Sequence, residues 1–169
     1  MKEILSELHD LLTTLRKDSK TYIKLLEPRL TNPNNDFERM LIRKALGSEK
    51  NRIISLKVLR NQIKEWIGEE PYKNPSTIAC VQLYADSHVE HVQLQSFIAH
   101  LDEAIILLAD SQRDELNDLY TRSQANQDEL QALISKLKSF MTDETQDEIQ
   151  PTHSDENEIR TFSVGSLLE

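Results

Sequence analysis

The chain has 169 residues, of which 38% are hydrophobic and 29% are charged, a length that fits one domain with an additional segment. Only three glycines and five prolines are present, which argues against the many turns of an all-β fold. The formal net charge of −9 disfavours nucleic acids and anionic membranes as partners. We therefore expect a helical protein that attracts cations rather than polyanions.

The chain carries one cysteine and no pattern that predicts export. Cys80 cannot form an internal disulfide, and a small buried hydrophobe is its expected role. The first residues follow helical periodicity and not a secretory pattern. The longest apolar run, Ala104 to Ala109, is far too short to cross a bilayer. These features predict a cytoplasmic protein with no membrane partner.

Two helices are predicted in the first part of the chain. Helical periodicity covers residues 1–27, and Pro28 is expected to end this helix because the residue before a proline avoids the α region. Asn35 or Asp36 is the predicted N-cap of the second helix, which is expected over residues 37–67. The predicted apolar stripes are Ile4, Leu8, Leu11, Leu12, Leu15, Tyr22, Leu25 and Leu26 in the first helix, and Leu41, Ala45, Ile53, Leu56, Leu59, Ile63 and Trp66 in the second.

The next two helices complete a bundle. The third is expected over residues 75–109 with Asn74 as its cap, and Ser111 followed by Asp114 resembles a capping box that starts a fourth helix. A continuous helix through this point is the alternative. The predicted stripes are Ile78, Val81, Ala85, Val92, Ile98, Leu101, Ile105 and Leu108, then Leu116, Leu119, Tyr120, Leu130, Leu133, Ile134, Leu137 and Phe140. Long amphipathic helices with short connections predict an all-α four-helix bundle over residues 1–141.

Polar side chains interrupt the predicted apolar faces. Glu49 falls on a core position of the second helix, where a carboxylate is costly unless it is paired or bound to a cation. Arg52, one turn on, can pair with it; alternatively, Glu49 faces His88 and His91 across the bundle. The two histidines are three residues apart, so they point the same way and can share a metal ion, with ordinary hydrogen bonds as the alternative. Mixed carboxylate and imidazole ligation suits iron or another first-row metal.

Other site motifs are absent from the sequence. The chain contains no Glu-x-x-His, the motif of standard ferritin-like di-iron centres, no glycine-rich phosphate loop and no Cys-x-x-Cys. Asp86 and Glu90 are expected off the polar face of the third helix, where they would be ligands only if a second subunit packs there. The predicted metal set is therefore Glu49, His88 and His91.

The end of the sequence differs in character from the bundle. Residues 142–160 carry seven acidic residues and one arginine, and we expect them to form a disordered acidic linker. Residues 161–169 are small and apolar, which is typical of a peptide that docks in extended form on another protein. Val164 and Leu167 would be its anchors, and Gly165 would allow close backbone approach. A frayed terminus is the alternative.

The amino-acid sequence of this peptide favours docking on a partner over a frayed terminus. Ser163, Val164, Gly165, Ser166 and Leu167 together resemble the cargo-loading peptides of encapsulins, the protein shells of bacteria and archaea, which commonly read small-Val-Gly-Ser-Leu behind a flexible linker. With its helical body, the chain is similar to the iron-mineralising encapsulin-associated cargo of Firmicutes, a divergent ferritin-like bundle. The resemblance implies an encapsulin shell protein as partner, and ferrous iron that is oxidised and stored as mineral inside the shell.

Two expectations remain open. The competing function is a non-enzymatic helical adaptor or chaperone whose histidines are structural and whose peptide docks on another partner. We also expect a homodimer with the third helix at or near the interface, because helices with uneven polar interruptions do not close one core alone. Two copies of the predicted set would supply two carboxylates and four imidazoles.

Overall fold

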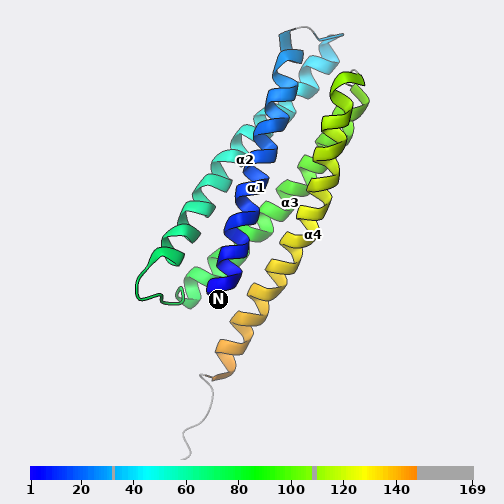
Figure 1. Ribbon diagram of the computed structural model, residues 1–169. Coiled ribbons are helices and arrows are strands. Elements are labelled where there is room, and N and C mark those ends of the chain that lie inside the picture. The colour runs from blue at the N-terminus through cyan, green and yellow to red at the C-terminus, as the bar shows by residue number, and fades with distance from the viewer. Residues whose placement is uncertain (32, 108–109, 148–169) are drawn as a thin grey trace, which may run out of the picture.

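The chain forms an antiparallel bundle of four long helices. The computed structural model describes residues 1–31, 33–107 and 110–147. In these ranges the chain folds into α1 (Lys2–Thr31), α2 (Asp36–Gly68), α3 (Thr77–Leu107) and α4 (Asp110–Asp147), with no strand. Each helix packs against the next, and α4 returns to pack against α1, so the helices form a ring around one core (Figure 1). The predicted all-α four-helix bundle is confirmed.

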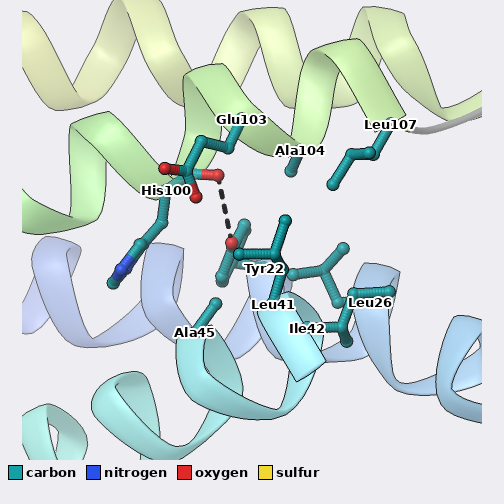
Figure 2. A pocket seen from close by; sticks show the side chains of 9 residues that line it. All are labelled: Tyr22, Leu26, Leu41, Ile42, Ala45, His100, Glu103, Ala104 and Leu107. Atoms are coloured by element: carbon teal, nitrogen blue, oxygen red, sulfur yellow. Dashed lines mark hydrogen bonds between the residues drawn. The ribbon is translucent and has the colours of Figure 1, made fainter. Parts of the chain in front are cut away.

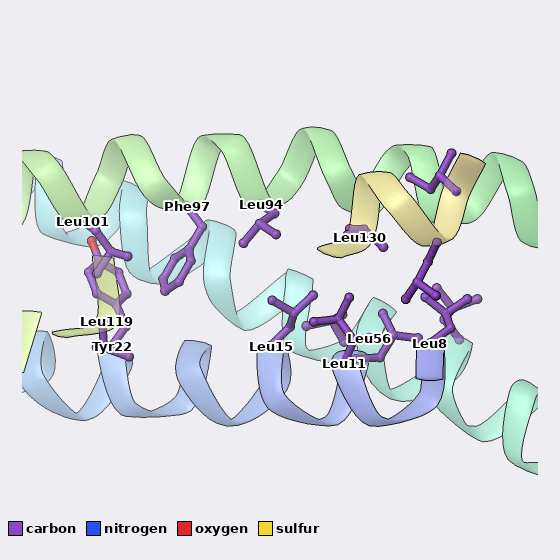
Figure 3. Packing of buried hydrophobic residues seen from close by; sticks show 14 of the residues in the cluster. Leu8, Leu11, Leu15, Tyr22, Leu56, Leu94, Phe97, Leu101, Leu119 and Leu130 are labelled. Atoms are coloured by element: carbon purple, nitrogen blue, oxygen red, sulfur yellow. The ribbon is translucent and has the colours of Figure 1, made fainter. Parts of the chain in front are cut away.

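The core is built from one stripe of each helix at alternating spacings of three and four residues. Such positions share one face, so the four stripes meet along the bundle axis. Figure 3 shows Leu15, Leu56 and Leu94 converging from α1, α2 and α3. Tyr22 and Phe97 meet edge to face with their ring centroids 5.2 Å apart, a favourable aromatic geometry. Each fully buried leucine or phenylalanine contributes about 1.5–3 kcal/mol, so these stripes are the main source of stability.

The first helix continues past the proline that was expected to end it. Pro28 lies inside α1, which ends at Thr31, so the predicted end at residue 27 is wrong. A proline removes one helical hydrogen bond, and contacts of the last turn offset that loss. Arg29 Nε lies 3.2 Å from Glu38 Oε1, and Leu30 packs against the core.

The starts of α2 and α3 are set by capping side chains. Asn35 caps α2, because its Oδ1 accepts from the Glu38 backbone N–H at 2.8 Å, and this prediction is confirmed. In return Glu38 Oε2 accepts from the Asn34 backbone N–H at 2.6 Å. The predicted Asn74 cap of α3 is wrong. Ser76 caps the helix instead, because its Oγ accepts from the Ala79 N–H at 3.3 Å, and α3 begins at Thr77.

The predicted core stripe of α3 is wrong over its first half, whereas Leu101 is buried as predicted and Ile98 and Ile105 pack, partly buried, against the core. Ile78, Val81 and Val92 are 83%, 53% and 63% exposed. The buried residues of α3 are Cys80, Leu83, Ser87, Glu90, Leu94, Phe97, Leu101 and Ala104. Apolar side chains occur on two faces of this helix, so periodicity alone could not identify the face that the other helices cover.

The bounds of α3 and α4 test two predictions, the break between these helices and the start of the acidic linker. The predicted break is present, since α3 ends at Leu107 and α4 begins at Asp110, but Ser111 lies inside α4 and so is not the predicted cap. α4 continues to Asp147, six residues into the segment expected to be a linker. The remainder of the predicted linker and all of residues 161–169 lie outside the described residues.

Candidate functional site

Each core stripe becomes polar near its middle. The buried polar residues near the middle of these stripes are Asp18 and Ser19 on α1, Glu49 and Arg52 on α2, Ser87 and Glu90 on α3, and Ser123 and Asn126 on α4. Apolar side chains lie on both sides of them along the bundle axis. Buried polar groups are costly unless they are paired, so their contacts decide what this layer can do.

Arg52 joins the buried Glu49 and Glu90 side chains. Its Nε and one terminal nitrogen lie 2.9 and 2.6 Å from Glu90 Oε1, and the other terminal nitrogen lies 3.3 Å from Glu49 Oε2 and 3.2 Å from Ser19 Oγ. The ring centroid of Phe97 is 4.9 Å from the guanidinium carbon. Arg52, Glu49 and Glu90 are at most 4% exposed. The cluster therefore links α1, α2 and α3 through charge-assisted hydrogen bonds that are largely shielded from water.

The electrostatics of this layer favour positive charge. Burial is the largest influence on the pKa of Glu90 and raises it; Arg52 lowers that pKa in part, and the nearby Glu49 carboxylate raises it again. Burial also raises the pKa of the Tyr22 phenol, and the charges of Glu49 and Glu103 add to that shift. Two carboxylates face one guanidinium, so the cluster keeps an excess of negative charge when both are ionised.

A second polar pairing ties α1 to α4. Asp18 accepts from Asn126 Nδ2 at 3.3 Å and from an Arg122 terminal nitrogen at 3.2 Å. The Asp18 carboxylate is thus satisfied by two donors of α4. These two hydrogen bonds stabilise the packing of α1 against α4, and they engage both oxygens of the Asp18 carboxylate.

The predicted metal ligands lie in two different places. Glu49 is buried in the core and pairs with Arg52, the alternative partner that the sequence left open. His88 and His91 are half-buried on α3, and the His88 ring lies edge to face against Tyr84 with centroids 4.6 Å apart. The described part of the chain holds no group of three or more His, Cys, Asp or Glu side chains that could bind a metal ion. The predicted docking residues Ser163 to Leu167 lie outside the described residues.

Glu90 is the site residue that the sequence prediction missed. It was expected off the polar face of its helix, and it is instead 3% exposed in the core. The signal was present: Leu83, Ser87, Glu90 and Leu94 follow one another at spacings of four, three and four residues, the pattern of a single helix face. The apolar residues on the opposite face masked this pattern.

Two hollows lie near these side chains. A groove of about 300 Å³ runs between α2 and α3, with exposed Ile54, Val58 and Val89 among its lining residues and Glu90 beside them. A second space, lined by Tyr22 and its neighbours, measures about 10 Å³ (Figure 2). There the Tyr22 hydroxyl donates to the His100 carbonyl at 3.2 Å, and the remaining room fits roughly one water molecule, so it is no substrate pocket.

Comparison with known families places the chain. A profile described as IMEF cargo Flp protein matches residues 8–141, which is most of the bundle. The chain belongs to this family. The predicted resemblance to a ferritin-like encapsulin cargo is thereby confirmed.

Two relatives agree with the IMEF cargo assignment. A protein of Bacillus thermotolerans named "Ferritin-like protein" is 29% identical over 103 residues, 60% of this chain and 54% of the relative, so the match spans about half of the relative's length. A solved structure titled "Crystal structure of an Iron binding protein" is 25% identical with a TM-score of 0.73, and the likeness covers 79% of this chain and 97% of that one. None of the described helices of the IMEF cargo chain has the length and apolar character needed to cross a membrane.

Proposed function

We propose that the chain is an encapsulin cargo that binds ferrous iron and oxidises it for mineral storage inside the shell. The observation that carries this proposal is the match of the IMEF cargo family over residues 8–141. The names of the two relatives support iron as the bound metal. The net charge of −9 also favours the approach of ferrous ions, most strongly at low ionic strength.

The proposed iron site is completed by a second copy of the chain. His88 follows Val81 by seven residues and precedes Val92 by four, so it lies beside the exposed apolar stripe of α3. A second α3 packed on that stripe would bring two pairs of His88 and His91 close together. Glu49, the carboxylate of the predicted set, is held by Arg52 and would reach the histidines only if that ion pair opened, so the imidazoles of the two chains carry the proposed site. This arrangement accounts for the lack of a ligand cluster among the described residues of one chain.

The chemistry assigned to the site needs dioxygen as the oxidant. Two ferrous ions each lose one electron, and dioxygen takes both electrons with two protons to give hydrogen peroxide. Imidazoles hold the ferrous ions, and carboxylates stabilise the ferric product by charge. The ferric ions then hydrolyse and join a growing mineral.

Histidine variants test the site. We expect His88→Ala and His91→Ala to lose bound iron and to slow ferrous oxidation, measured by ultraviolet absorbance, while circular dichroism stays helical. His9→Ala is the matched control, because His9 lies near the start of α1 and its ring pairs with the neighbouring Asp10 at 3.1 Å. Unchanged iron handling together with a lower melting temperature would instead assign the histidines a structural role.

The partner is tested through the terminal peptide. We expect deletion of residues 161–169 to leave the bundle folded and to abolish capture in co-expressed encapsulin shells, where many weak contacts act together. A finer pair of variants keeps the length: Val164→Ser with Leu167→Ser should abolish loading, while Ser163→Ala with Ser166→Ala should keep it. Full loading of the deletion variant would refute this part of the proposal.

One observation favours the competing function of a non-enzymatic adaptor. The Glu49 carboxylate is already satisfied by Arg52, as a purely structural core requires. The two functions differ in metal content: the iron proposal requires stoichiometric iron in the purified protein, and the adaptor requires a folded, metal-free bundle.

A further inference from the structure

We propose that the Arg52 guanidinium is a built-in cation that occupies the core carboxylates and closes the interior of this bundle to metal ions. Ferritin-like bundles hold metals between carboxylates that project inward from facing helices. Glu49 of α2 and Glu90 of α3 project inward in the same way, and the guanidinium lies between them. The core therefore does not fit the metal centre that its fold implies.

The contacts of the guanidinium are close to saturated. Its Nε–H and one terminal nitrogen donate to Glu90, while the other terminal nitrogen donates to both Glu49 and Ser19. Four of its five N–H groups thus have an acceptor. The rigid guanidinium presents N–H groups in one plane to Glu90, Glu49 and Ser19 together, which the compact ammonium of a lysine would not do.

Displacement of Arg52 by an entering metal would be costly. The side chain is 2% exposed, and Phe97 against its face is fully buried. Above and below the polar layer the core is apolar, so a displaced guanidinium would lie unpaired among leucines and phenylalanine. A buried charge without a partner is strongly unfavourable, so the resident cation stays in place.

Removal of Arg52 should open a latent site. Glu49 and Glu90 would then face each other without a counter-charge, and Ser19 would lose its donor. Two carboxylates and a hydroxyl are oxygen ligands of the kind that manganese accepts. This inference is independent of ferrous oxidation, and it leaves Glu49 out of the proposed iron set for as long as Arg52 is present.

The test compares Arg52→Met with the double variant Arg52→Met and Glu90→Gln, using MnCl₂ as the probe. Methionine fills the volume without a charge. At a concentration well above its dissociation constant, manganese should raise the melting temperature of Arg52→Met by roughly 5–10 °C more than that of the native protein. The double variant, which has lost one carboxylate, should show no excess rise. If Arg52→Met folds poorly, refolding with and without manganese gives the same comparison by circular dichroism.

A second measurement keeps Arg52 in place. Glu90→Gln should bind as many ferrous ions per chain as the native protein, because the core carboxylates hold none of them. A fall in that number would overturn the inference, and so would an Arg52→Met variant that gains no manganese site. Failure of the histidine variants to affect iron would leave these manganese results unchanged, so the two proposals fail separately.

Discussion

The two faces of α3 have similar composition and different surroundings. The inner face buries Leu83, Leu94 and Phe97 against the other helices. The outer face carries Ile78, Val81, Val89, Val92 and Ile106, which are between 53% and 83% exposed. A helix that is apolar on both sides is usually buried on both sides. One chain covers only the inner face, so the outer face is where the proposed second copy would pack.

The faces also differ in what their polar residues do. On the inner face, Glu90 is held by Arg52 and is nine-tenths or more buried. Beside the outer face, His88 contacts the Tyr84 ring and is half-buried. The inner polar group thus has a fixed charge partner, whereas the outer imidazoles lie where a partner chain or a metal ion can reach them.

The largest expected effect is a loss of stability that alanine substitution causes on the inner face of α3 and not on its outer face. Phe97→Ala should lower the free energy of unfolding by about 3–5 kcal/mol, because it leaves a cavity and removes the ring that contacts both Tyr22 and Arg52. Val89→Ala on the outer face is the control and should change it by less than about 0.5 kcal/mol in dilute monomer. Urea unfolding followed by circular dichroism measures both. Equal losses for the two variants would mean that the outer face is packed within one chain.

The next prediction concerns self-association through the outer face of α3. Val89→Asp or Val92→Asp should weaken self-association at least thirtyfold, about 2 kcal/mol, because a carboxylate would be buried without a partner. Gln131→Asp on an exposed position of α4 is the matched control and should leave association unchanged. Sedimentation equilibrium measures the dissociation constants. A native protein that stays monomeric at micromolar concentration would contradict the proposed dimer.

The sequence predicted the architecture better than the orientation of its helices. The number of helices, the Asn35 cap and the burial of Glu49 followed from periodicity and capping chemistry, which are local signals. The inner face of α3 did not follow, because Leu83 and Leu94 compete with an equally apolar stripe on the other side. Which stripe is buried depends on the packing of α4 and α2, and that information is not local.

The same limit applies to the candidate site. A pairing of Glu49 with Arg52 was foreseeable from their spacing of three residues. The capture of Glu90 by Arg52 joins residues 38 positions apart, and no local pattern identifies such a partner. Pro28 shows the reverse case, where a strong local signal for a helix end is overcome by tertiary contacts of Arg29 and Leu30.

A smaller effect of opposite sign probes the inner face. Ser87 is fully buried, and its Oγ has no hydrogen-bond partner among the described residues. Ser87→Ala should therefore raise the free energy of unfolding by about 1 kcal/mol, since it removes an unsatisfied hydroxyl and improves helix propensity. Ser96→Ala, at an exposed position of α3, isolates the propensity part. A loss of stability in Ser87→Ala alone would show that the hydroxyl has a partner in solution, such as a buried water.

The smallest expected effect concerns the contact of α1 with the inner face and depends on pH. Tyr22 donates to the His100 carbonyl of α3, so Tyr22→Phe should cost about 0.5–1 kcal/mol near pH 8.

Burial raises the pKa of this phenol above its ordinary value of 10.0, and Glu49 and Glu103 contribute to the shift. Below pH 10 the phenol is protonated in both the folded and the unfolded state, so its contribution is complete. Above that pH the unfolded state releases the proton first, and the contribution is lost as the pH rises toward the folded-state pKa. The native protein should therefore lose stability faster than Tyr22→Phe as the pH rises above about 10, and urea unfolding at several pH values from about 9 upward measures the difference. Parallel curves for the two proteins would mean that the phenol ionises as freely in the bundle as in the unfolded chain.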